Sequence, residues 1–304
     1  GERNMAKKFG RILLPVVLLM SAVAVFSSCS GGSASVSPSE SDNAANQTSE
    51  NASSDSETEV QVFIAASLEN AFQEIIPLYN ESNPNVKITY NADSSGTLLT
   101  QIQEGYACDI FFSAATAQVD TLESENLAIE GTRVDMLANK VCLITAKNSG
   151  TKVTGMANLK DAENMALADG SVPVGKYTRK ALMELGYIEK TEDAASITTQ
   201  QISDALGIEI NECGNVSKVK EAVKEGANEV GTVYYSDAYS VKDDVDIIEE
   251  LDTSVTGDII YPMIRVQNKE ATDEVTAAAD DFYAFLQTDE VKAIFEKYMF
   301  IVNK

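Results

Sequence analysis

From residue 60 to the end of the chain, short apolar runs of strand character alternate with segments whose apolar residues recur at helical spacing. The first run, residues 60–68, is rich in β-branched residues and predicts a buried strand. Further strands are predicted at 86–90, 109–113, 141–146, 165–168, 230–235 and 259–266. The alternation predicts an α/β fold with mostly parallel sheets and ligands at the carboxyl ends of the strands.

Helical patterns follow most of these strands. They lie at 68–79, 98–104, 119–126, 175–185, 216–225 and 272–298, the last as one helix or two. Pro77 interrupts the first pattern and predicts a kink or a break there, because proline removes a backbone donor inside a helix.

Four helix starts follow a strand or loop with small or hydroxyl residues. Ser67 is predicted to cap the first helix, and Ser95 and Gly96 lie in a polar turn, 91–97, before the second. Val174 and Val216 stand at the other two starts. Free N–H groups at helix starts attract anions, so the four can converge on one oxyanion. Each start alone is equally explained by an ordinary capped helix.

The chain contains no histidine. This excludes Ser-His-Asp and Cys-His catalysis and removes the commonest metal ligand, so no cation site is expected. A lipid-anchored hydrolase that used Ser67 or Ser95 would need a lysine base, and no Ser-x-x-Lys spacing occurs at either serine. The chain is therefore predicted not to be an enzyme.

The net charge is −24, which argues against nucleic acid as a partner because phosphate binding needs clustered Lys and Arg. Any anion site must then work through local dipoles and not through the overall field.

The first 29 residues have the pattern of an export signal. Basic residues precede an apolar core, 12–26, that is shorter than the ~20 residues a membrane-spanning helix needs. Phe-Ser-Ser-Cys at 26–29 resembles a bacterial lipoprotein cleavage box, so Cys29 is expected to be lipidated; a plain secretory signal is the alternative. Residues 30–59, polar and Ser-rich, are predicted to form a disordered tether. The folded part is expected outside the cytoplasm, anchored to the cell membrane.

Three further cysteines, Cys108, Cys142 and Cys213, show no Cys-x-x-Cys spacing. An odd number argues against a complete disulfide framework, and we predict buried, unpaired thiols.

Five short segments of distinctive composition occur between residues 60 and 240. They are Val-Phe-Ile-Ala-Ala-Ser-Leu at 62–68, Ser-Ser-Gly-Thr-Leu at 94–98, Asp-Ile-Phe-Phe-Ser-Ala at 109–114, Val-Pro-Val-Gly-Lys-Tyr at 172–177 and Gly-Thr-Val-Tyr-Tyr-Ser-Asp-Ala at 231–238. In this order they resemble the molybdate-binding protein family, the substrate-binding components of molybdate ABC transporters. The resemblance spans residues 60–304.

The resemblance implies a set of ligand contacts. Ser67 and Ser95 would bind through their hydroxyl and N–H groups, Val174 and Val216 through backbone N–H groups, and Tyr234 through its phenol. All five are neutral donors, which suits a fully deprotonated tetrahedral dianion, whereas a protonated oxyanion would prefer at least one acceptor. Molybdate or tungstate is the expected ligand, with sulfate or another oxyanion as the alternative and no cofactor. Without the resemblance, Tyr234 would be interpreted as a core tyrosine.

Two positions depart from the family pattern. Val174 stands where the family usually has Ala, and Ala115 stands where it commonly has Asp. Lys176 and Arg179 lie on the predicted helix 175–185. They are interpreted as part of a solvated helix face and not as anion ligands.

The fold that the resemblance implies is a two-lobed periplasmic-binding-protein architecture of type II. One lobe would comprise 60–139 and 251–304, and the other 140–250, with two crossings that allow a hinge. The anion would bind between the lobes and favour closure. A membrane permease with a cytoplasmic ATPase would recognise the closed form. The protein is expected to be a monomer.

Overall fold

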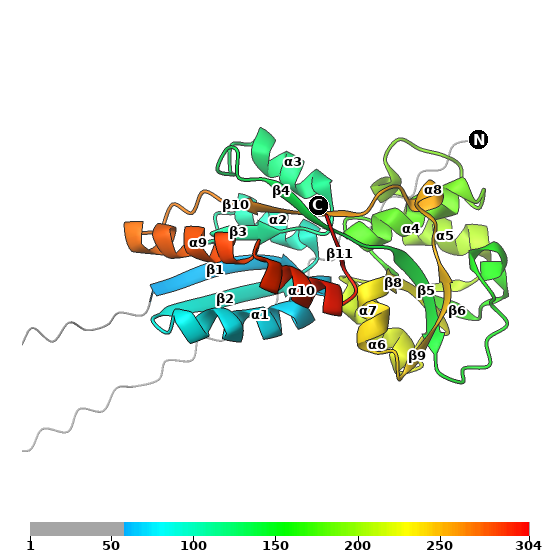
Figure 1. Cartoon of the computed structure of the whole chain (residues 1–304). Helices are drawn as coiled ribbons and strands as arrows, with labels where there is room; N and C mark the ends of the chain where they lie inside the picture. Colours follow the sequence, from blue (N-terminus) through cyan, green and yellow to red (C-terminus); the bar gives the residue numbers. More distant parts are fainter. Residues whose placement is uncertain (1–57, 304) are drawn as a thin grey trace, which may run out of the picture. The chain divides into compact units, whose positions relative to one another are not determined.

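Residues 58–303 are described by the computed structural model, in which two sheets are flanked by helices (Figure 1). The predicted export signal, Cys29 and nearly all of the tether 30–59 lie outside these residues. Within residues 58–303, no helix is long and apolar enough to cross a membrane.

The first sheet has the strand order β11-β4-β10-β3-β1-β2. Its strands are β1 (Thr58–Ala65), β2 (Val86–Asp93), β3 (Ile110–Phe112), β4 (Val134–Ala138), β10 (Ile260–Arg265) and β11 (Ile301–Val302). Strand β1 pairs in parallel with β2 and β3, whereas β10 is antiparallel to β3 and β4, and β11 is antiparallel to β4.

The second sheet has the order β7-β6-β8-β5-β9. Its strands are β5 (Val141–Ala146), β6 (Asn164–Ala168), β7 (Glu209–Cys213), β8 (Val230–Tyr234) and β9 (Val245–Glu250). Strand β6 pairs in parallel with β7 and β8, and β5 pairs antiparallel with β8 and β9.

Helices cover both sheets (Figure 1). The α-helices are α1 (Glu69–Ser82), α2 (Ser95–Gln103), α3 (Thr116–Ser124), α4 (Pro173–Glu184), α5 (Thr199–Leu206), α6 (Val216–Lys224), α7 (Tyr235–Ser240), α8 (Thr253–Thr256), α9 (Asp273–Phe285) and α10 (Asp289–Lys297). Short 3-10 turns lie at η1 (Ala66–Leu68), η2 (Met156–Asp161) and η3 (Ala194–Ser196).

The chain passes from the first sheet to the second between β4 and β5, and returns between β9 and β10. The predicted two-lobed α/β fold is confirmed. The expectation of mostly parallel sheets is corrected, because each sheet mixes parallel and antiparallel pairs. Every antiparallel pair includes a strand next to a crossing, and such a strand has no βαβ connection that would make it parallel to its neighbour.

The C-terminal return packs into the core of the first lobe. The rings of Phe72, Phe112 and Phe295 form a cluster with centroid separations of 5.8–6.3 Å. They come from α1, β3 and α10, so packing of apolar side chains joins both ends of the folded chain. The predicted segment 272–298 forms two helices, α9 and α10.

Pro77 does not break the first helix, since α1 continues through it to Ser82. The buried face of α1 lies on both sides of the proline, and its packing offsets the backbone hydrogen bond that proline removes. This face consists of Ala71, Phe72, Ile75 and Tyr79.

The sequence patterns missed β4, β7, β9, β11, α5, α7 and α8. Strands β7 and β9 are the two edges of the second sheet and are largely exposed, so they carry polar residues and form no apolar run. Helix α7 is only 6 residues long, too short for a periodic pattern. The prediction for Cys108, Cys142 and Cys213 is confirmed, because all three are buried and free.

Candidate functional site

The turn after β1 places Ser67 inside a helical segment and not at its cap. Turn η1 runs directly into α1, whose N-cap is Leu68, and no side chain caps either segment. The predicted capping role of Ser67 is therefore wrong. Its hydroxyl instead lies 3.0 Å from the hydroxyl of Tyr261 on β10, and both residues are buried.

Two serines at the start of α2, Ser94 and Ser95, have different roles. Ser94 is the N-cap and accepts a hydrogen bond from the N–H of Thr97. Ser95 is the first helical residue, and its Oγ accepts a hydrogen bond of 2.9 Å from the N–H of Ala114. The predicted turn 91–97 is thus divided between the end of β2 and the start of α2.

Helix α4 begins without a side-chain cap, which leaves its first N–H groups available to a ligand. Val172 is the N-cap, Pro173 opens the helix and Val174 follows. Gly175 is required by close packing, since a Cβ there would lie 2.1 Å from the carbonyl oxygen of Asp169. Only glycine lets the helix start this close to the end of β6.

Helix α6 begins at Val216, and its cap contacts the first lobe. Asn215 Oδ1 accepts a hydrogen bond from the N–H of Lys218, and Asn215 Nδ2 donates to Asp93 Oδ1 at 3.0 Å. One amide group therefore completes the helix start and bonds the residue that ends β2.

Tyr234 ends β8 and is 1% exposed. Its hydroxyl has no hydrogen-bond partner among residues 58–303. Burial raises the pKa of this phenol well above its usual value, so the hydroxyl stays protonated and can donate a hydrogen bond. An unpartnered buried donor is costly, and a ligand that accepts from it would relieve that cost.

One cavity brings all five predicted ligand residues together, from both lobes. It is lined by Ala65, Ala66, Ser67, Asp93, Ser94, Ser95, Ala114, Val172, Pro173, Val174, Val216 and Tyr234. Only small, apolar and hydroxyl side chains surround it, apart from one carboxylate.

That carboxylate, Asp93, is the lining residue with formal charge, and sequence reasoning missed it. Its Oδ1 accepts hydrogen bonds from the N–H of Ser94 at 2.7 Å and from Asn215 at 3.0 Å. Its position directly before the predicted Ser94–Ser95 helix start was the available signal. Two donors on one oxygen partly neutralise the charge that Asp93 brings to the cavity.

Lys176 and Arg179 do not line the cavity. The interpretation of Arg179 as part of a solvated face is wrong, because the residue is 1% exposed. Its guanidinium donates to the carbonyl oxygens of Ile197 and Ala168 at 2.8 Å and of Gly175 at 3.0 Å. Burial lowers the pKa of Arg179, and its role here is to join α4 to the end of β6.

Ala115, one of the two departures from the family pattern, stands at a helix cap. Ala115 is the N-cap of α3, and no side chain caps that helix. An Asp at this position would have a side-chain oxygen for the first N–H groups of α3.

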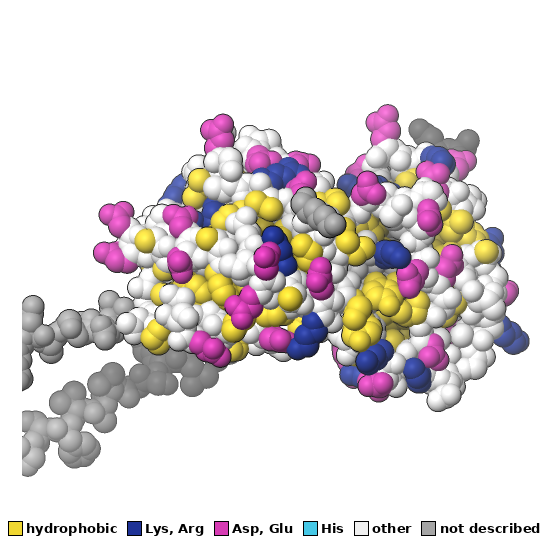
Figure 2. Space-filling model, in the orientation of Figure 1, with side chains coloured by type: hydrophobic (Ala, Val, Ile, Leu, Met, Phe, Trp, Pro, Cys, Tyr) yellow, Lys and Arg dark blue, Asp and Glu magenta, His cyan; other side chains and the backbone are white. Residues whose placement is uncertain are grey.

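The charge of the chain is spread over its surface. On the face shown in Figure 2, Lys and Arg side chains are scattered among Asp and Glu. Residues 58–303 contain no cluster of three or more side chains that could hold a metal ion. The field in the cavity therefore comes from local hydroxyl and N–H dipoles and from the carboxylate of Asp93.

Comparisons with known proteins agree with this geometry. The family model described as bacterial extracellular solute-binding protein matches residues 60–301. The putative ABC transporter substrate-binding lipoprotein YvgL of Bacillus subtilis is 32% identical over 255 residues, which are 83% of this chain and 90% of that protein. The molybdate-binding protein ModA of Escherichia coli is 27% identical and covers 81% of this chain and 90% of its own length.

Solved structures show the same fold. The substrate-binding domain of a putative molybdenum ABC transporter from Clostridium difficile has a TM-score of 0.57 at 28% identity, over 81% of this chain and 99% of that one. The periplasmic molybdate-binding protein of Azotobacter vinelandii has a TM-score of 0.65 at 18% identity, over 81% of this chain and all of that one. These likenesses confirm the type II periplasmic-binding-protein architecture.

Proposed function

The chain belongs to the bacterial extracellular solute-binding proteins, and on that premise we propose that it captures molybdate or tungstate for an ABC transporter. The ligand would bind in the cavity lined by Ser67, Ser95, Val174, Val216 and Tyr234. The protein is a binding component and carries out no covalent chemistry on the anion.

The observation that carries the proposal is the unpartnered hydroxyl of Tyr234 in this cavity. A buried phenol that stays protonated requires an acceptor, and a fully deprotonated tetrahedral oxyanion has acceptors on all sides. The hydroxyls of Ser67 and Ser95 add two further neutral donors from the other lobe.

The helix starts add backbone donors. Helices α2, α4 and α6 all begin at the cavity, and each directs N–H groups and the positive end of its dipole toward it. The carboxylate of Asp93 repels a dianion, but hydrogen bonds from Ser94 and Asn215 partly offset its charge. Neutral donors of this number compensate the charge of the anion without a Lys or Arg side chain.

We extend the proposal to the movement of the lobes. Residues 60–139 and 251–304 would form one lobe and 140–250 the other. An anion bonded to Ser67 and Ser95 on one side and to Tyr234 on the other would stabilise the closed state. A permease with a cytoplasmic ATPase would then accept the anion from the closed monomer, which a lipid on Cys29 would hold at the membrane.

Calorimetric titration of residues 58–304 with molybdate, tungstate, sulfate and phosphate tests the proposal. Heat of binding and a rise in melting temperature are expected with the first two anions, because a ligand that binds only the folded state stabilises it. No heat and no thermal shift with either would contradict it. Tight binding of sulfate alone would reassign the ligand.

The site itself is tested by Ser67→Ala and Ser95→Ala. Each should weaken oxyanion binding by about 1–3 kcal/mol, the scale of a hydrogen bond to a charged group. Ser203→Ala is the matched control, since the hydroxyl of Ser203, on α5, donates to the carbonyl oxygen of Ile208 and does not line the cavity. Unchanged affinity in both site variants would place the ligand elsewhere.

A further inference from the structure

Both serine hydroxyls of the cavity are contacted from behind by a second protein group. Ser95 Oγ accepts a hydrogen bond of 2.9 Å from the N–H of Ala114, which can only donate. Ser67 Oγ lies 3.0 Å from the hydroxyl of Tyr261, where either oxygen can be the donor. The direction of the second bond decides whether Ser67 still has a proton for the anion.

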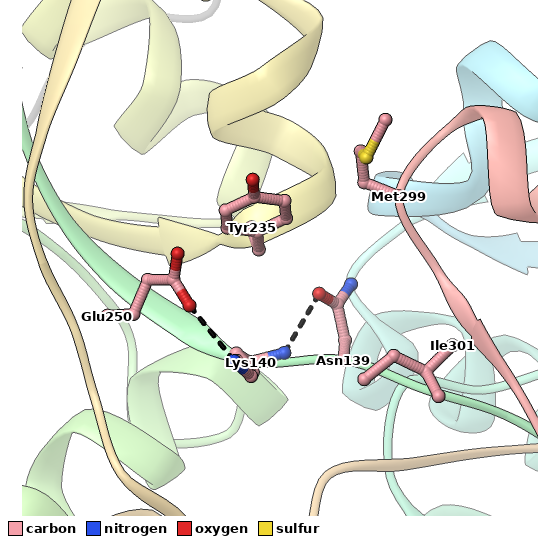
Figure 3. A pocket seen from close by; sticks show the side chains of 6 residues that line it. All are labelled: Asn139, Lys140, Tyr235, Glu250, Met299 and Ile301. Carbon is pink, nitrogen blue, oxygen red and sulfur yellow. Dashed lines mark hydrogen bonds and ion pairs between the residues drawn. The ribbon is translucent and has the colours of Figure 1, made fainter.

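The surroundings of Tyr261 favour one direction. Asn139 Nδ2 lies 3.4 Å from the Tyr261 oxygen and 2.9 Å from Ser236 Oγ, and an amide nitrogen can only donate. The amide oxygen of Asn139 is held on its other side by the N–H of Lys140 at 2.9 Å (Figure 3). If Tyr261 accepts from Asn139, its own proton is free to be donated to Ser67.

We propose that Tyr261 is a positioning residue that, supported by Asn139, makes the Ser67 hydroxyl a donor to the bound anion. The proposal rests on the proposed function, because it concerns how the same cavity distinguishes between oxyanions.

A hydroxyl has one proton, and a proton used inside the protein cannot serve the ligand. A hydroxyl that accepts a hydrogen bond also becomes a stronger donor and a weaker acceptor, because hydrogen bonds in a chain polarise one another. Ser67 and Ser95 are then both biased toward donation. This bias favours an oxyanion without protons over one, such as hydrogen phosphate, that must donate a hydrogen bond itself.

The same bonds connect the cavity to the crossings between the lobes. Asn139 lies in the first crossing, between β4 and β5, and Tyr261 lies on β10, the strand that directly follows the second crossing. Asn139 also lines a separate pocket of about 320 Å³ with Lys140, Tyr235, Glu250, Met299 and Ile301 (Figure 3). Tyr261 is fully buried, and its hydroxyl lies within hydrogen-bond distance of Ser67 and Asn139.

A double-mutant cycle of Tyr261→Phe with Ser67→Ala tests the inference. In the wild-type background, Tyr261→Phe should weaken molybdate binding about three- to fivefold, because Ser67 keeps its proton but loses the bond that directs it to the anion. In the Ser67→Ala background, it should change affinity less than twofold. The ratio of molybdate to phosphate affinity, measured by competition, should fall with Tyr261→Phe.

Equal effects of Tyr261→Phe in both backgrounds would overturn the inference and leave the proposed function intact. Absence of oxyanion binding to the wild-type protein would overturn the proposed function, and the inference with it. Tyr79→Phe is the matched control, because it removes a buried hydroxyl that bonds Asp281 at 2.8 Å in the same lobe and should leave both affinities unchanged.

Asn139→Asp supplies an independent variant should Tyr261→Phe fold poorly. A carboxylate at this position accepts a hydrogen bond from the Tyr261 hydroxyl. Ser67 must then donate to Tyr261 and not to the anion. Molybdate binding should weaken tenfold or more, and the loss should again shrink in the Ser67→Ala background. The added charge is present in both backgrounds, so an undiminished loss would also overturn the inference.

Discussion

Asn215 of the second lobe donates its side-chain amide to Asp93 of the first lobe at 3.0 Å, directly beside the cavity. The two residues are 122 positions apart in the chain. A second close approach accompanies this bond, because a Cβ on Gly96 of α2 would lie 2.8 Å from the carbonyl oxygen of Ser171. The lobes therefore meet through specific contacts of their own, in addition to any that a ligand makes.

Asn215→Ser should weaken oxyanion binding by about 1 kcal/mol, the contribution of one hydrogen bond. Serine caps a helix as well as asparagine, so α6 is preserved, but its side chain is too short to reach Asp93 as well. Calorimetry measures the affinity. Thr198→Ser at the cap of α5 is the control and should have no effect; an unchanged affinity for Asn215→Ser would show that the bond to Asp93 does not contribute to closure.

Gly96→Ala should lower oxyanion affinity by more than tenfold. The new Cβ would contact the Ser171 carbonyl oxygen and hold the lobes apart, whereas the ligand-free protein should be unchanged or more stable by about 0.5–1 kcal/mol, since Ala suits a helix better than Gly. Titration and urea unfolding measure the two effects. Thr100→Ala, at an exposed position of the same helix, should leave the affinity intact. Normal binding by Gly96→Ala would show that Gly96 and the Ser171 carbonyl oxygen are not this close in the ligand-bound state.

Tyr234→Phe should act on stability and on binding in opposite directions. Removal of a buried hydroxyl without a partner should stabilise the ligand-free protein by about 1 kcal/mol, while the loss of a donor should weaken oxyanion binding by about 1–3 kcal/mol. Tyr79→Phe removes a hydroxyl that bonds Asp281, so it should lower stability and spare binding. A loss of stability in Tyr234→Phe would indicate that its hydroxyl already has a partner.

Asp237→Asn should stabilise the protein above neutral pH. Asp237 is 3% exposed, and burial raises its pKa from 3.8 to about 6, partly opposed by Lys220. A carboxyl whose pKa is raised in the folded state favours folding while it is protonated, and this advantage is lost as the pH rises through 6. Asparagine keeps the neutral form at every pH.

The stability difference between Asp237→Asn and the wild type should therefore grow from near zero below pH 4 to about 3 kcal/mol above pH 7. Urea unfolding at several pH values measures it, with the exposed Asp243→Asn as control. A difference that does not change with pH would mean that Asp237 titrates normally in the folded protein.

Much of the architecture could be predicted from the sequence because it depends on neighbours in the chain. Short apolar runs and a 3.6-residue spacing of apolar residues identified most strands and helices, and strand β5 was predicted with its observed bounds. Edge strands β7 and β9 were missed because an exposed, polar strand has no apolar run to detect. Pro77 was misjudged because packing of the α1 face outweighs a local preference.

The candidate site was likewise predicted only in part. Ser67, Ser95, Val174 and Val216 stand at predicted helix starts, whereas Tyr234 and the donor role of all five came from the resemblance to a known family. The structure places all five around one cavity. Their roles as ligands stay a proposal. Asp93 was missed although it directly precedes the predicted helix start, because no local pattern reveals that its side chain lines the cavity.

By itself, the sequence determined the order of most strands and helices and the burial of the three cysteines, because periodicity involves residues only a few positions apart. The set of neutral donors followed from the resemblance of short segments to a known family. The tertiary structure alone decided what each donor faces. Tyr261 lies 194 positions from Ser67, and Asn215 lies 122 positions from Asp93. Pairs this distant in the chain meet only when the two sheets are assembled and the chain has crossed between them twice, so no local pattern could predict them.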